Sequence, residues 1–144
     1  MVAIPYAGVG PSFVFLLKEP GLLQGYLAGD LNPKAVELMR LNIARWTKKG
    51  ETELNPSTTV CKDARMWKDE PELRGRADVV LVNLPHDSFE HLPDLFPLFV
   101  PHGEGLLRGW AIIERTSIDS RVEQLERLVR AAGGTPKETH VSEI

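Results

Sequence analysis

The chain has 144 residues, of which 42% are hydrophobic and 26% charged, and its formal net charge is -3. This length allows one domain with a substantial core, and the composition is that of an ordinary globular protein. The acidic balance argues against strong unaided binding to nucleic acid, which needs a clear surplus of Lys and Arg.

The cysteine, histidine and hydropathy patterns exclude further classes. Cys61 is the only cysteine, so no internal disulfide can form, and a reducing, cytoplasmic location is expected. No apolar run approaches the roughly 20 residues that cross a bilayer, so we predict no membrane partner. The histidines and Cys61 lack the spacing of metal ligands, so we predict no metal site.

Short apolar segments alternate along the chain with segments of helical periodicity. We predict strands at 2–6, 25–30, 58–62, 77–85 and 105–114, with a sixth strand beginning within 137–144. We predict helices at 11–18, 32–46, 89–99 and 120–134, the third interrupted by Pro93 and Pro97. A polar connection covers 48–58, and 64–75 is predicted to be a loop with one helical turn.

Two of the predicted helices have an apolar face. The helix 32–46 has Asn32 as a natural N-cap and Pro33 as a natural first residue. Its mostly apolar face is predicted to consist of Ala35, Leu38, Met39, Asn42, Ile43 and Trp46. In the helix 120–134 the inward residues are predicted to be Val122, Leu125, Leu128 and Val129.

This alternation predicts an α/β fold, a Rossmann-like parallel sheet with helices on both faces, in a single domain of residues 1–144. Ligands of such sheets bind outside the carboxyl ends of the strands, near the point at which the strand order reverses. The residues that follow each strand are therefore the candidate site.

A glycine turn follows the first strand and an acidic residue follows the second. Gly8 and Gly10 allow a tight turn and a close approach of the backbone to a ligand. Asp30 comes 22 residues after Gly8, where a carboxylate can accept hydrogen bonds from the hydroxyls of a ribose. A dinucleotide fingerprint would have a third glycine where this chain has Phe13, which disfavours NAD.

The third and fourth strands end in further polar groups. Asp63 could accept from an exocyclic amine of adenine or cap the next turn. Asn83 offers a donor and an acceptor, and Pro85 stiffens the backbone beside it, so this turn could hold a flat base edge. His86 is a candidate for acid-base catalysis or an ordinary surface residue.

Four stretches in this order, "YAGVGP", "GDLNPKAVELMRLNI", "CKDAR" and "ADVVLVNLPHDSFEHL", resemble class I S-adenosylmethionine-dependent methyltransferases. Within that class they are similar to the tRNA (guanine-37-N1)-methyltransferase family and to its wybutosine-synthesis relatives. The resemblance extends from Ala3 to about Glu114. It implies S-adenosylmethionine as cofactor and tRNA as partner. From the acidic net charge we expect this chain alone to bind tRNA only weakly.

The resemblance also implies roles for individual residues. Gly8 and Gly10 would wrap the methionine part of the cofactor, Asp30 would bind the ribose, and Asp63 with Ala64 the adenine. The full set of expected cofactor-binding residues is Ala7, Gly8, Gly10, Asp30, Asn32, Asp63, Ala64 and Asn83. Asn83, Leu84 and Pro85 would line the pocket for the target guanine, and the expected catalytic residues are Asn83, Pro85 and His86.

The chain departs from the family pattern at both ends, where we expect it to be truncated. The Arg/Glu-rich segment that precedes the glycine turn in the family is absent, and "THVSEI" stops where the family continues through a final hairpin. Glu114 and His86 are the only local candidates for a general base. We therefore expect the isolated chain to bind S-adenosylmethionine but to methylate tRNA poorly.

Three alternative functions remain open. The first is an aminocarboxypropyl transferase of wybutosine synthesis, which the sequence Asn83-Leu84-Pro85 disfavours. The second is an NAD-dependent oxidoreductase domain. The third is a non-catalytic methyltransferase-like module that pairs with a partner domain or forms a homodimer.

Overall fold

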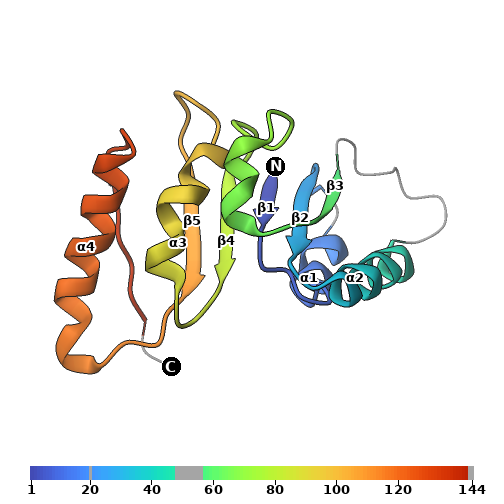
Figure 1. Cartoon of the computed structure of the whole chain (residues 1–144), viewed down its shortest axis with the longest axis horizontal. Helices are drawn as coiled ribbons and strands as arrows, with labels where there is room; N and C mark the ends of the chain where they lie inside the picture. Colours follow the sequence, from blue (N-terminus) through green and yellow to red (C-terminus); the bar gives the residue numbers. More distant parts are fainter. Residues whose placement is uncertain (20, 48–56, 143–144) are drawn as a thin grey trace.

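In the part of the chain that the structure describes, five short strands form one sheet in the order β3-β2-β1-β4-β5, and every pair is parallel (Figure 1). The computed structural model describes residues 1–19, 21–47 and 57–142. The strands are β1 Val2–Ile4, β2 Tyr26–Asp30, β3 Thr58–Cys61, β4 Val79–Asn83 and β5 Leu106–Trp110. Because β1 pairs with β2 on one side and β4 on the other, the strand order reverses at β1, where α/β sheets bind ligands.

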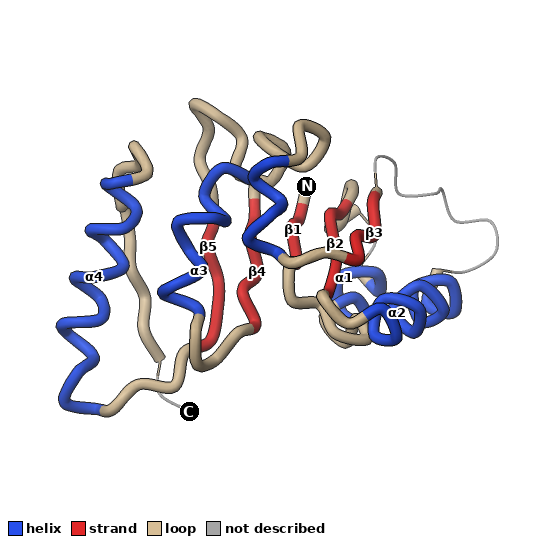
Figure 2. Tube along the Cα trace, viewed as in Figure 1, coloured by secondary structure: helices blue, strands red, loops and turns tan. Residues whose placement is uncertain are grey.

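Helices cover both faces of this sheet, which confirms the predicted fold class. The α-helices are α1 Phe13–Lys18, α2 Pro33–Trp46, α3 Ser88–Leu95 and α4 Ile118–Ala131. Three short 3-10 helices are η1 Ala64–Asp69, η2 Phe96–Leu98 and η3 Arg115–Ser117. In Figure 2, α4 lies at the end of the molecule opposite α2.

Alternate residues of the central strands pack into two separate core clusters, one on each face. Ala3 of β1 belongs to a cluster with Trp67 of η1 and Leu92 of α3. Ile4, the next residue along β1, belongs to a cluster with Phe13 of α1 and Met39 of α2. The first two helices therefore cover one face, and η1 with α3 covers the other.

Helix α2 begins as predicted, and its buried face overlaps the predicted one. The Asn32 side chain accepts a hydrogen bond from the Lys34 amide at 2.9 Å, which caps the helix. The buried residues are Val36, Met39 and Ile43, whereas Leu38 is 38% exposed. Positions 36, 39 and 43 form one narrow helical stripe. The prediction included Met39 and Ile43 correctly but missed Val36.

The C-terminal third differs most from the predictions. The predicted strand 105–114 ends at Trp110, and the predicted sixth strand is wrong for 137–142, which form no strand; residues 143–144 lie outside the described part. Among the described residues β5 pairs only with β4. Within this described part, its other edge therefore has no neighbouring strand with which the residues after Trp110 or the C-terminal segment could pair. Helix α4 has no fully buried residue, although Leu125 and Leu128 pack against the core.

Several other helix boundaries differ from the predicted ones by a few residues. The first predicted helix begins at Phe13, two residues after Pro11, and the helix predicted at 89–99 ends at Leu95. A 3-10 turn containing Pro97 follows it, because proline cannot donate the next helical hydrogen bond. The predicted connection 48–58 lies mostly outside the described residues.

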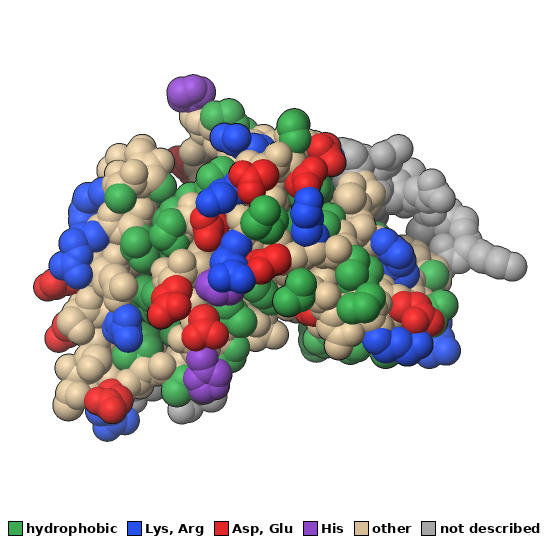
Figure 3. Space-filling view, viewed as in Figure 1, with side chains coloured by type: hydrophobic (Ala, Val, Ile, Leu, Met, Phe, Trp, Pro, Cys, Tyr) green, Lys and Arg blue, Asp and Glu red, His purple; other side chains and the backbone are tan. Residues whose placement is uncertain are grey.

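The surface carries intermixed charges. On the face drawn in Figure 3, Lys and Arg side chains alternate with Asp and Glu side chains. Among the described residues, no helix combines the length and apolarity required to cross a membrane.

Candidate functional site

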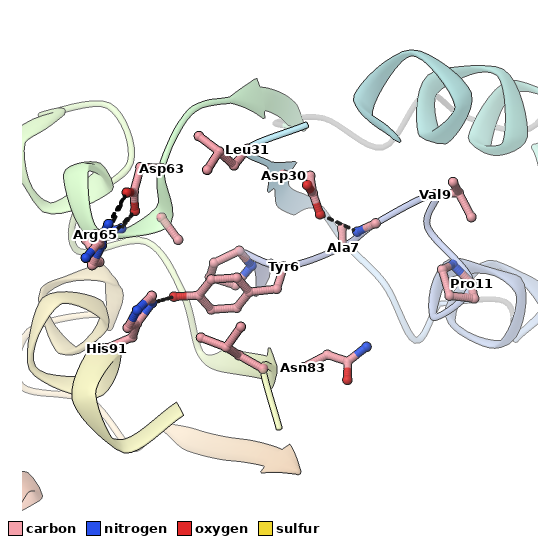
Figure 4. Close-up of a pocket in the computed structure, with 14 residues that line it drawn as sticks. Tyr6, Ala7, Val9, Pro11, Asp30, Leu31, Asp63, Arg65, Asn83 and His91 are labelled. Carbon is pink, nitrogen blue, oxygen red and sulfur yellow. Dashed lines mark hydrogen bonds and ion pairs between the residues drawn. The ribbon is translucent and has the colours of Figure 1, made fainter. Parts of the chain in front are cut away.

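A cavity of about 520 Å³ opens at the carboxyl ends of the first four strands, at the point where the strand order reverses. Its size falls within the range of small-molecule sites. Figure 4 shows the side chains around it. Its lining consists of Pro5, Tyr6, Ala7, Gly8, Val9, Pro11, Asp30, Leu31, Asp63, Ala64, Arg65, Asn83, Leu84 and His91. Six predicted cofactor-binding residues are therefore brought together: Ala7, Gly8, Asp30, Asp63, Ala64 and Asn83.

The glycine turn after β1 contacts the acidic residue at the end of β2 directly. The Gly8 amide donates to Asp30 Oδ2 at 3.0 Å, and the Asn32 amide donates to Asp30 Oδ1 at 2.9 Å (Figure 4 shows the first). Gly8 has φ +55°, a left-handed conformation that favours glycine, and a Cβ there would meet nothing within 4 Å. The two strands thus place a fixed carboxylate and bare backbone on one wall of the cavity.

The opposite wall holds an ion pair. Arg65 donates to Asp63 through its side chain, with Nη2 2.6 Å from Oδ2, and through its backbone amide, 3.0 Å from Oδ1. The Arg65 side-chain hydrogen bonds lower the pKa of Asp63 to about 2, and the backbone bond adds to this. Asp63 is therefore ionised and held in one orientation at neutral pH.

This ion pair leads to a prediction about pH. Because the folded pKa of Asp63 lies below the ordinary 3.8, the pair contributes stability above that pH and loses it as the pH falls through about 2. The change in stability will be small, because water screens an exposed pair. A carbon-13 titration of the Asp63 carboxyl should give a midpoint near 2, and Arg65→Leu should move it towards 3.8. An ordinary midpoint in the unsubstituted protein would contradict the pairing.

Tyr6 and His91 also line the cavity, and neither was among the candidate site residues predicted from the sequence. The Tyr6 hydroxyl shares a hydrogen bond of 2.6 Å with His91 Nδ1 (Figure 4). Burial raises the pKa of Tyr6, with a further contribution from the Asp63 carboxylate, so the phenol stays protonated. Tyr6 directly precedes the predicted turn and could have been included from the sequence. The position of His91 depends on how α3 packs, which no local motif indicates.

Four predicted site residues lie outside the cavity lining. Gly10 packs against α2, since a Cβ there would be 3.1 Å from Met39 Cγ, and Asn32 caps that helix. Pro85 and His86 line a separate hollow of about 60 Å³. Their expected roles towards a ligand remain predictions, as do those of the residues that do line the cavity.

The charged groups of the cavity define the ligands that it suits. Among the described lining residues Arg65 is the only Lys or Arg, and its charge is already paired with Asp63. Asp30 has two backbone donors and no ion-pair partner among the described residues. In the same part of the chain, no group of three or more His, Cys, Asp or Glu side chains is arranged to hold a metal ion. The charges of the lining therefore suit a ligand that is neutral or cationic.

Comparison with known proteins supports the fold but assigns no family. No protein-family model matches the sequence, and no curated protein matches it. Among solved structures, TYW2 of M. jannaschii, determined in complex with AdoMet, has a TM-score of 0.72 at 22% identity, over 92% of this chain and 55% of that one. The chain thus spans about half the length of that protein.

Two further structures have the same fold at lower identity. A SAM-dependent O-methyltransferase of Thermotoga maritima has a TM-score of 0.58 at 14% identity, over 88% of this chain and 43% of that one. A candidate rRNA methylase of Clostridium thermocellum also has a TM-score of 0.58, at 15% identity, over 90% of this chain and 69% of that one. This chain therefore shares its fold with methyltransferases.

Proposed function

We propose, on the premise of this shared fold, that the chain binds S-adenosylmethionine and forms the catalytic core of an RNA methyltransferase. The observation that carries the proposal is the hydrogen bond between the Gly8 amide and the Asp30 carboxylate at the reversal point of the sheet. It joins the two elements that a nucleoside-bearing ligand needs, bare backbone and a ribose acceptor, in one cavity.

The charge of the lining favours S-adenosylmethionine over NAD. A sulfonium ligand is cationic, and the cavity offers it the Asp30 carboxylate without a competing cation. The pyrophosphate of NAD would need positive charge, whereas the only basic side chain among the described lining residues, Arg65, is tied to Asp63. Phe13, which stands where a dinucleotide fingerprint has glycine, is fully buried in the core.

Each wall residue has a task in this proposal. Asp30 accepts hydrogen bonds from the ribose hydroxyls, and Asp63, ionised and fixed by Arg65, accepts from the exocyclic amine of adenine. Asn83, at the end of β4, orients the acceptor base. S-adenosylmethionine would supply an electrophilic methyl group, so the residues mainly position and align the acceptor.

The acceptor that we propose is N1 of guanine 37 in tRNA. The support is the resemblance of the stretch around Asn83-Leu84-Pro85 to the family that carries out this reaction. Attack by N1 requires a base to remove its proton, and His86 and Glu114 are the exposed candidates near β4 and β5. Aminocarboxypropyl transfer in wybutosine synthesis is the second candidate, and the TYW2 neighbour supports it.

A ligand-dependent thermal shift tests the binding step. S-adenosylhomocysteine at about 100 times its Kd should stabilise the protein by about 2.7 kcal/mol, which corresponds to a rise in Tm of roughly 5–10 °C. NAD at the same concentration should leave Tm unchanged. A shift with NAD alone would favour an oxidoreductase, and a shift with neither ligand would favour a non-catalytic module.

A further inference from the structure

The glycine turn is held from behind by helix α2 as well as from the front by Asp30. The Asn42 side chain donates through Nδ2 to the Val9 carbonyl at 3.0 Å. One helical turn earlier, Met39 packs against Gly10, where a Cβ would be 3.1 Å from Met39 Cγ. Helix α2 therefore contacts two successive residues of the turn.

These contacts fix the peptide group in the middle of the turn. The Gly8 amide is bonded to Asp30 and the Val9 carbonyl to Asn42, so the peptide between Gly8 and Val9 has an anchor on each side. Among the described residues, the Gly8 carbonyl and the Val9 amide themselves have no hydrogen-bond partner. Both residues line the cavity, so this peptide group remains available to a ligand.

Asparagine is an unfavourable choice for its place in the helix. Asn42 lies inside α2, next to buried Ile43, where leucine would favour the helix more. Asparagine inside a helix also tends to compete with the helical hydrogen bonds. Its amide nitrogen is the donor that reaches Val9, which gives a specific reason for the residue at this position.

We propose that Asn42 is a positioning residue for the cofactor, which acts through the Val9 carbonyl to hold the Gly8–Val9 peptide in its ligand-binding orientation. The inference rests on the proposed function, because the ligand is the adenosine-bearing sulfonium described above. Asn42 itself does not line the cavity, so its effect on binding is indirect.

The test compares four variants in the full chain. Asn42→Leu removes the donor, Asn42→Asp replaces it with a carboxylate facing the Val9 carbonyl, and Asn42→Gln keeps a donor. Arg45→Leu, at an exposed position of the same helix, is the matched control. The Kd for S-adenosylhomocysteine is measured by calorimetry, the carbonyl carbon-13 shift of Val9 by NMR, and the unliganded Tm by circular dichroism.

Asn42→Leu should weaken the binding of S-adenosylhomocysteine about 10-fold, as expected for one lost hydrogen bond. Asn42→Asp should weaken this binding further. The Gln variant should recover part of the affinity, and Arg45→Leu should match the unsubstituted protein. Wild-type affinity in folded Leu and Asp variants would overturn the inference. If the unsubstituted protein does not bind S-adenosylhomocysteine, the proposed function fails. The carbonyl carbon-13 shift of Val9 then tests the role of Asn42 separately. This shift should change in the Leu and Asp variants, and an unchanged shift would refute that Asn42 positions the turn.

Discussion

Replacing Asp30 with alanine is expected to weaken S-adenosylhomocysteine binding by at least about 100-fold, as measured by calorimetry. Asp30 is the ribose acceptor of the proposed site, and hydrogen bonds to a charged group contribute about 1.5–3 kcal/mol each. The loss also frees the Gly8 amide, which the carboxylate holds at 3.0 Å, so the turn loses its front anchor. The unliganded protein should remain folded, because Asp30 lies at the end of β2 and is only half-buried.

Two variants make this result specific. Asp30→Asn keeps the shape and one acceptor oxygen, so its affinity should lie between those of the wild type and the alanine variant. Asp69→Ala removes an exposed aspartate that does not line the cavity and should bind like the wild type. If the Asp30→Ala protein retained wild-type affinity, the site proposed at the reversal point of the sheet would have to be abandoned.

The largest loss of stability is expected one residue earlier, at Gly29. An alanine Cβ there would lie 2.3 Å from the Val60 carbonyl oxygen and 2.5 Å from Trp67 Cζ2. The first contact is with the backbone of the neighbouring strand β3, and the second is with a fully buried indole, so neither can move cheaply. Gly29→Ala should lower the free energy of unfolding by about 3 kcal/mol, measured by urea denaturation.

Gly103 provides the matched control for this substitution. A Cβ at Gly103 would meet only ordinary contacts with Val100, at 3.7 Å and beyond. Gly103→Ala should therefore change the free energy of unfolding by less than about 0.5 kcal/mol, as is usual for surface positions. Equal midpoints for the two alanine variants would show that β2 and β3 can separate enough to admit a side chain.

The features of the site that lie at strand ends could be predicted from the sequence. The predicted ends of β1, β2 and β4 lie within two residues of the observed ends. Because parallel strands end at one edge of a sheet, Gly8, Asp30 and Asn83 were expected to be neighbours. The Gly8–Asp30 hydrogen bond spans 22 residues of sequence, yet a strand-turn-helix-strand pattern implies this proximity. Fold class was predictable for the same reason, since alternation alone favours a parallel sheet.

Features that depend on side-chain packing could not be predicted. His91 reaches Tyr6 because α3 packs beside η1 over one face of the sheet, and the sequence shows only a helix with Pro93 in it. Gly10 and Gly8 look alike in the sequence, but one faces Met39 and the other open space. The extent of β5 depended on a neighbouring strand that the described chain does not provide.

The strand that begins the chain is the middle strand of the sheet (Figure 1). Its backbone pairs with β4, where Val2 faces Val79 and Ala3 faces Val80, so its second edge is covered by a strand that lies far along the sequence. Pairings this distant in sequence close large loops and slow folding. The cavity lining likewise combines residues that follow β1, β2 and β3 with Asn83 of β4, so the cavity is complete only when this distant pairing has formed.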